Sequence, residues 1–126
     1  MKDLKITDEQ ISDLMVTALE GGINYWCGKT EMKKDVLGIG FDGVTLADDE
    51  EVVYGSDLIA KGGTLILHDA ESSDKWELNK EKFMVGLEKV MEWGEFESIE
   101  ELMDEHDAET ADVLIQFAIF NEIVFG

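Results

Sequence analysis

TLILHDAESSDKWELNKEKFMVGLEKVMEWG, residues 64–94, carries the clearest structural signals in the chain. Its first part holds two runs of strand-forming residues, 64–70 and 75–78, with a short polar segment between them, which predicts a β-hairpin. Asn79 is a typical N-cap, and Gly94 is suited to end the helix that it starts. Between them, apolar side chains recur along one face of that helix: Phe83, Met84, Leu87, Val90 and Met91.

Helical signals flank this stretch on both sides. Thr7 and Gln10 form a capping box, which predicts a helix that ends at the pair Gly21-Gly22 in a left-handed glycine conformation, followed by a strand over 23–27. Ser98 begins a further helix, and Asp107 begins a last one that is apolar almost all round and is therefore expected in the centre of the core. Residues 122–126 are expected as a short strand or a packed tail.

Residues 36–61 give weaker signals. Strand-forming residues surround the turn pair Asp42-Gly43, residues 48–51 form an acidic loop, and a short helix from Ser56 is expected to end before Gly62-Gly63. Together the segments predict a single α+β domain over residues 1–126, with a small, mostly antiparallel sheet packed with three to four helices.

Charge is the most biased property of the chain. Thirty acidic residues face ten lysines and no arginine, for a net charge of −20. Direct binding of nucleic acid needs a basic face, and so does binding to anionic membranes, so neither is expected. A single cysteine allows no internal disulfide, and no apolar run has the length of a membrane span, so the cytoplasm is the expected location.

The densest acidic stretch is residues 92–112, which contains no lysine. Carboxylates on helix turns repeat at a spacing of the order of phosphate spacing in a nucleic-acid strand. Such an array is either an ordinary solvated helix face or a surface that binds a basic protein in place of nucleic acid. The predicted contact residues are Glu95, Glu97, Glu100, Glu101, Asp104, Glu105, Asp107 and Glu109.

A second candidate site surrounds GGINYWCGK, residues 21–29. In a strand, Asn24 and Trp26 share one face, where an amide and an indole suit a ring with polar edges. Lys29 and Lys61 lie next to glycines, and glycine-rich backbone can cradle phosphate. The alternatives are a pocket for a small nucleotide, to which His68 and Asp69 also contribute, or two glycine helix ends with Trp26 in the core.

Catalysis and metal binding have little support in the sequence. Cys27 with His68 and Asp69 lacks any local signature of a nucleophilic cysteine, and Asp69 with Glu71 fits a polar strand end better than it fits an acid–base pair. The two histidines form no spaced cluster with Cys27, and residues 48–51 lack the ligand pattern of a calcium loop. We therefore expect no enzymatic activity, no metal and no cofactor.

Three stretches carry a family resemblance: ALEGGINYWC (18–27), GGTLILHDAE (62–71) and ADVLIQFAIFNEIVFG (111–126). They resemble a family of small acidic proteins of phages, prophages and Gram-positive bacteria, for which no activity is established. The resemblance implies an accessory phage protein that acts on the host, including its defence systems. It implies no catalytic residue.

These observations lead to two functional hypotheses. The first is a phage or prophage protein that inhibits a basic host protein, such as a nuclease effector of bacterial immunity, by presenting an acidic surface that mimics nucleic acid. The alternative is a protein that sequesters a small nucleotide signal in the pocket around Asn24 and Trp26. The apolar residues 118–126 either pack within the monomer or form a homodimer contact.

Overall fold

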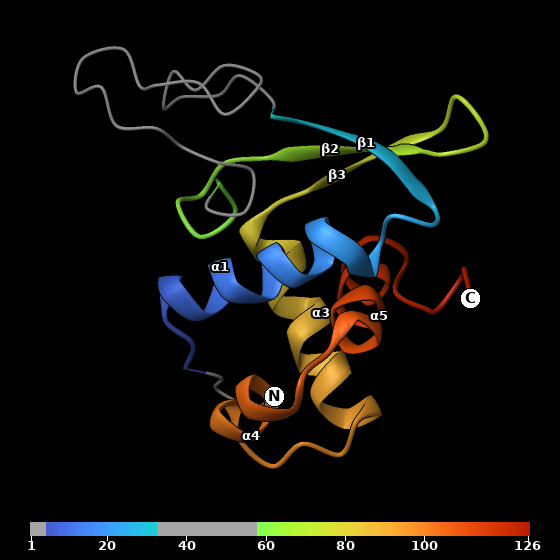
Figure 1. The fold of residues 1–126 in the computed structure, drawn as a ribbon. Coiled ribbons are helices and arrows are strands. Elements are labelled where there is room, and N and C mark those ends of the chain that lie inside the picture. Colours follow the sequence, from blue (N-terminus) through green and yellow to red (C-terminus); the bar gives the residue numbers. More distant parts are fainter. Residues whose placement is uncertain (1–4, 33–57) are drawn as a thin grey trace, which may run out of the picture.

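The computed structural model describes residues 5–32 and 58–126, which form a three-stranded sheet on top of a group of helices (Figure 1). The order along the chain is α1 (Asp8–Thr17), η1 (Ala18–Gly22), β1 (Cys27–Met32), β2 (Leu65–Asp69), β3 (Lys75–Leu78), α3 (Lys80–Trp93), α4 (Ile99–Glu105) and α5 (Ala108–Phe120). The predicted α+β class is therefore confirmed. The expected strands over 36–54, the acidic loop 48–51 and the start of the helix at Ser56 lie outside the described residues.

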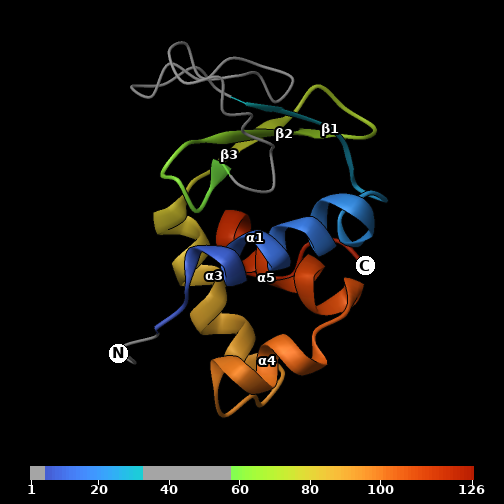
Figure 2. The ribbon, with the colours of Figure 1, turned by 60° about the vertical axis from the view of Figure 1, so that its left-hand side comes forward.

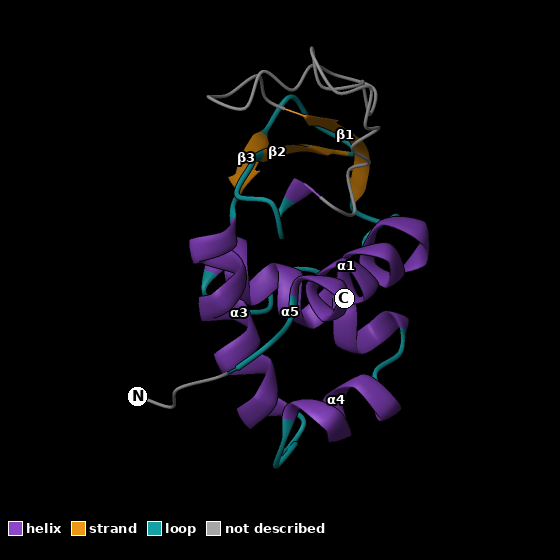
Figure 3. Ribbon diagram, turned by 90° about the vertical axis from the view of Figure 1, so that its left-hand side faces the viewer, coloured by secondary structure: helices purple, strands orange, loops and turns teal. Residues whose placement is uncertain are grey.

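The sheet is antiparallel, with strand order β1-β2-β3. The predicted hairpin forms with Leu65 opposite Leu78 and His68 opposite Lys75. Leu65, Leu67 and Leu78 are buried, whereas Ile66 between the first two is only half-buried, so the alternation places one face of the sheet on the helices (Figure 3).

The helix caps predicted at Thr7, Asn79, Ser98 and Asp107 form, while the one predicted at Ser56 lies outside the described residues. Thr7 accepts from the Gln10 amide while the Gln10 side chain accepts from the Thr7 amide, and Asn79 and Asp107 accept from the amides of Lys82 and Thr110. Ser98 accepts from the Glu101 amide as predicted. Glu101 follows Ser98 by three residues, the spacing of a capping box, but its carboxylate accepts from the Glu97 amide rather than from the Ser98 amide.

The expectation for residues 21–27 is wrong in two respects. The last turn of the first helix widens into the π-helical turn η1, in which the Ile23 amide donates to the carbonyl of Ala18. Gly22 has no positive φ; a Cβ there would lie 2.8 Å from the Ala108 carbonyl oxygen, so glycine is needed for close packing against α5. Residues 23–26 form a turn, and the strand begins only at Cys27.

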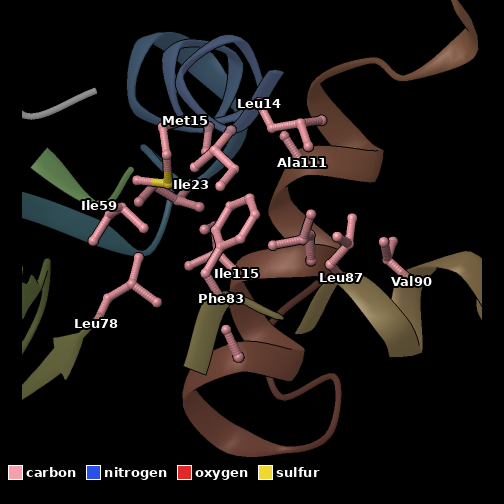
Figure 4. Close-up of a cluster of buried hydrophobic side chains, with 14 of the residues drawn as sticks. Leu14, Met15, Ile23, Ile59, Leu78, Phe83, Leu87, Val90, Ala111 and Ile115 are labelled. Carbon is pink, nitrogen blue, oxygen red and sulfur yellow. The ribbon is translucent and has the colours of Figure 1, made fainter. Parts of the chain in front are cut away.

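The core lies between the sheet, α1, α3 and α5. Phe83 of α3 is at its centre, surrounded by side chains of α1, α5 and β3 (Figure 4). The close approach of α3 to α5 depends on Gly86, where a Cβ would lie 2.8 Å from the Cβ of Ala118. The prediction that the last helix is central is thus confirmed, since α5 is buried along most of its length.

Candidate functional site

The acidic stretch forms the end of the molecule opposite the sheet, where α4 and the turns on either side of it lie (Figures 1 and 2). Ile99 and Leu102 are buried and fix α4 to the core, which directs the other faces of this short helix outward. We call this surface the acidic end. Its exposed carboxylates are Glu92, Glu95, Glu97, Glu100, Asp104, Glu105, Asp107 and Glu109, and Glu101 is half-buried.

Glu95 takes an unusual backbone conformation in the turn between α3 and α4. Its φ is 56°, and its amide donates to the Glu92 carbonyl while the Phe96 amide donates to the Met91 carbonyl. This is the hydrogen-bond pattern of a Schellman motif, in which glycine usually occupies the left-handed position. Gly94 lies one residue before this left-handed position and has a φ of −91°. The predicted glycine therefore ends the helix, but Glu95 takes the left-handed conformation.

The turn between α4 and α5 is held by side-chain hydrogen bonds. Asp107 accepts from the backbone amide and the hydroxyl of Thr110, at 2.9 and 3.0 Å, and these bonds lower the pKa of Asp107. His106 contacts the Met103 carbonyl through Nδ1 at 3.0 Å and Thr17 Oγ1 through Nε2 at 3.1 Å. The second contact ties α4 to α1, so the acidic end is fixed relative to the rest of the fold.

Several lysines of the described part of the chain lie in or beside the sheet, whereas acidic residues occur throughout the fold. Lys29 and Lys75 belong to the sheet, and Lys80 and Lys82 to the first turn of α3 beside it, whereas no lysine follows Lys89. The ion pairs found among residues 5–32 and 58–126 join Lys29 and His68 to Glu31, and Lys80 to Asp8. None of them involves the acidic end, so its negative potential is not neutralised by these pairs.

The structure separates the residues of the second candidate site. Trp26 is only 2 % exposed, donates through Nε1 to Asp112 at 2.7 Å and stacks on Phe125. Asn24 is exposed and, with Lys29, lines an open surface depression of about 270 Å³ next to Cys27. The expectation that Asn24 and Trp26 share a strand face is wrong because residues 23–26 form a turn. Trp26 is thus a core residue, and Lys61 is exposed and does not line this depression.

Cys27 and His68 lie on neighbouring strands but have different partners. Cys27 Sγ donates to the Lys29 carbonyl at 3.4 Å, and burial raises the pKa of its thiol. His68 binds Glu31 through Nε2, which lowers the pKa of that carboxyl. A buried thiol with a raised pKa is a poor nucleophile.

Asp69 stabilises the hairpin turn. Its carboxylate accepts from the Glu71 amide at 2.8 Å and from the Ser72 hydroxyl at 3.0 Å. Such bonds are typical of a polar strand end that leads into a turn, which was one of the two interpretations of Asp69 and Glu71; the other was an acid–base pair. Within the described ranges, no group of three or more His, Cys, Asp or Glu side chains is arranged to hold a metal ion.

Sequence reasoning missed a buried polar network around Asp112, which belongs to the acidic stretch but is only 7 % exposed. Its carboxylate accepts from Tyr25 Oη at 2.6 Å, Trp26 Nε1 at 2.7 Å and Gln116 Nε2 at 2.9 Å. Gln116 in turn accepts from the amides of Val124 and Phe125. The available signal was the pair of polar residues one turn apart in an otherwise apolar helix.

The same network packs the C-terminal tail within the monomer. Phe125 stacks on Trp26 with ring centroids 5.0 Å apart, and Trp76 and Phe120 complete an aromatic cluster. Residues 122–126 are therefore a packed tail rather than a strand, although Ile123 and Val124 remain 45 % and 51 % exposed.

Comparisons with known proteins found no matching family model, no matching curated protein and no matching solved structure. No helix in the ranges described above has both the length and the apolar character that a bilayer span needs.

Proposed function

We propose that this protein is a non-enzymatic accessory protein of phage or prophage origin that inhibits a basic host protein by binding it through the acidic end. The partner's surface is one that otherwise binds nucleic acid, and a nuclease effector of bacterial immunity is a suitable target class. The observation that carries the proposal is an ordered surface of exposed carboxylates with no ion pair to any described residue. The site of action would be the cytoplasm of the bacterial host.

The cost of this surface supports a role beyond solubility. Glu100 with Asp104, and Glu101 with Glu105, are like charges one helix turn apart, and each such pair costs about 0.2–0.5 kcal/mol. Asp104 and Glu105 lie in the last turn of α4, where the helix dipole disfavours negative charge and no basic residue compensates for it. Charges kept at a cost to stability are typical of functional surfaces.

Charge reversal tests the proposal. One variant changes Glu97, Glu100, Asp104 and Glu105 to lysine and spares Glu101, whose carboxylate caps the turn before α4. A control of equal net charge reverses four exposed acids elsewhere: Glu9, Asp13, Glu20 and Glu71. Proteins captured from a lysate of a Gram-positive host are compared among the two variants and the wild type.

The proposal predicts a basic partner that the wild type and the control retain and the acidic-end variant loses. Added DNA or RNA should displace that partner, and so should high salt, because screening weakens the attraction between charges. Retention of the partner by the acidic-end variant, or no effect of nucleic acid, would exclude mimicry by this surface.

A further inference from the structure

Three aromatic rings form a slot around the ring of Phe125. They belong to Trp26 before β1, Trp76 of β3 and Phe120 at the end of α5, which lie far apart in the sequence. The three rings also contact one another, with centroid distances of 5.9 Å between the tryptophans, 4.9 Å between Trp76 and Phe120, and 5.7 Å between Trp26 and Phe120. The walls of the slot therefore hold one another in place independently of the ring inside it.

The slot is suited to an aromatic side chain. The Phe125 ring stacks on Trp26 with an interplanar angle of 5°, and it meets Phe120 and Trp76 edge to face at 5.8 and 6.3 Å. Stacked and edge-to-face pairs at such distances are the arrangements that aromatic rings favour. An aliphatic or polar side chain at this position would lose all three ring contacts.

Beside the slot, the side chain of Gln116 binds the backbone of the tail. Its Oε1 accepts from the amides of Val124 and Phe125 at 2.7 and 2.8 Å, and its Nε2 donates to the Phe125 carbonyl at 3.2 Å. The side chain is fully buried, and its second donor bond, to Asp112 at 2.9 Å, fixes the orientation of the amide group. Gln116 therefore recognises main-chain groups, which any residue other than proline supplies at these positions.

The tail is attached to the rest of the fold at few points. Asn121 takes a left-handed φ of 65° and ends α5, and the chain then turns back beside this helix (Figure 1). Within the described part of the chain, the hydrogen bonds of residues 122–126 all involve Gln116, and Ile123 and Val124 are about half exposed. A terminal segment with so few buried contacts opens locally at a lower free energy than the whole fold.

We infer that the aromatic slot and Gln116 form a binding site for a short peptide segment with one aromatic side chain, and that residues 122–126 occupy it as a tethered ligand that detaches at Asn121. The site recognises one ring and two amides, so the side chains at positions 123 and 124 are free to vary. Its residues lie outside the acidic end, so this site is separate from the surface of the proposed function.

The occupant is the tail of the same chain. A short tether gives the tail an effective concentration of about the millimolar range, which a free ligand has to exceed. The tail of a second copy would also bring another net charge of −20 against the first, and such repulsion opposes exchange between copies.

Hydrogen exchange of the wild-type chain, followed by nuclear magnetic resonance, tests whether the tail detaches. The amides of Val124 and Phe125 are bound by Gln116, whereas the amide of Ile115 lies in the middle of α5. We expect the two tail amides to exchange by local opening, at rates that low concentrations of urea leave unchanged, while exchange of the Ile115 amide accelerates. If the tail amides showed the same urea dependence as Ile115, the tail would open only with the whole fold and the inference would be overturned.

A peptide added in trans tests what the site recognises. The probe is an acetylated peptide with the sequence of residues 121–126, and its binding to full-length Phe125→Ala is followed by tryptophan fluorescence. Phe96→Ala, at a half-buried phenylalanine between α3 and α4, is the matched control because it leaves the tail intact. Three modified probes carry alanine in place of Phe125, an N-methyl group on the Phe125 amide, or an N-methyl group on the Ile123 amide, which lies outside the pair bound by Gln116.

We expect the probe to bind Phe125→Ala at least about tenfold more tightly than the wild type or Phe96→Ala, whose own tails compete with it. The alanine probe and the probe methylated at Phe125 should bind at least about tenfold more weakly, and the probe methylated at Ile123 should bind like the parent. Absence of binding to a folded Phe125→Ala, or equal binding of the alanine probe, would overturn the inference. Neither result bears on the proposed function, because the acidic end is unchanged in every variant.

Discussion

Replacing Asp112 by alanine should destabilise the fold more than any other removal of a single negative charge. The change deletes the acceptor of three hydrogen bonds, and the three donors are not equally affected. Tyr25 is 56 % exposed, so its hydroxyl can turn to water, and Gln116 keeps the Phe125 carbonyl at 3.2 Å. The Trp26 indole is buried, and a buried donor left without an acceptor costs about 1–3 kcal/mol.

Because Tyr25 and Gln116 keep other partners, the unpaired Trp26 donor dominates, and we expect a decrease of about 1–3 kcal/mol in the free energy of unfolding. That is a large part of the roughly 5–15 kcal/mol that stabilises a typical domain. Urea unfolding followed by far-ultraviolet circular dichroism measures this change directly.

Asp112→Asn separates the hydrogen bonds from the charge. Trp26 and Gln116 both donate to Oδ1 of Asp112, so an asparagine carbonyl in that position preserves both bonds, and its amide can donate to the hydroxyl of Tyr25. We expect a loss of about 1 kcal/mol or less. Asp104→Asn, at an exposed acid of α4, is the control for charge removal and should be neutral or slightly stabilising. If Asp112→Ala were as stable as Asp104→Asn, or no less stable than Asp112→Asn, the network would not stabilise the fold as argued.

Three further predictions follow from single positions. Gly86→Ala should lower the free energy of unfolding by about 2 kcal/mol, because overpacking against α5 exceeds the gain in helix propensity. Gly21→Ala, with open space around it, should be neutral or stabilising. Equal effects of the two substitutions would contradict the close approach of α3 to α5 at Gly86. Glu95→Gly should raise the free energy of unfolding by about 1 kcal/mol, because glycine adopts the left-handed conformation of residue 95 without strain, whereas Glu95→Ala should give no such gain. An equal gain from both substitutions would mean that removal of the Glu95 charge, and not relief of backbone strain, is responsible. Burial, followed by the hydrogen bond to Asp112, raises the pKa of Tyr25 to about 12. The stability that this shift provides is therefore complete below about pH 10 and is lost as the pH rises to about 12. Spectrophotometric titration of the wild type against Tyr25→Phe measures the pKa of Tyr25, and ionisation of Tyr25 near pH 10 would refute the prediction.

Local signals in the sequence were sufficient for most helices and for the hairpin. Asn79, Ser98 and Asp107 cap the helices that they were expected to cap, because a cap depends only on a side chain and amides two or three residues away. The hairpin register likewise follows from the burial of Leu65 and Leu78 on one face.

The predictions that differ from the structure concern residues whose conformation depends on contacts with distant parts of the chain. Residues 23–27 fit the pattern of a strand, but the bonds of Tyr25 and Trp26 to Asp112, a residue far along the chain, accompany a turn there. Asp112 itself looked like one more surface acid, because composition does not distinguish a buried carboxylate from an exposed one. Gly22 and Gly94 were correctly placed at helix ends, but neither takes the left-handed conformation.

The buried and the exposed acids of residues 92–112 therefore serve different purposes. The carboxylate of Asp112 accepts three hydrogen bonds and stabilises the core. The acids of α4 repel one another, Asp104 and Glu105 in its last turn also oppose the helix dipole, and Glu95 adds a strained backbone. A chain selected only for stability would lose Glu95, Asp104 and Glu105 at little cost, because each is exposed and none forms an ion pair with the described lysines. Their retention on one rigid end is what a surface for a cationic partner requires, since fixed charges are not reorganised when the partner binds.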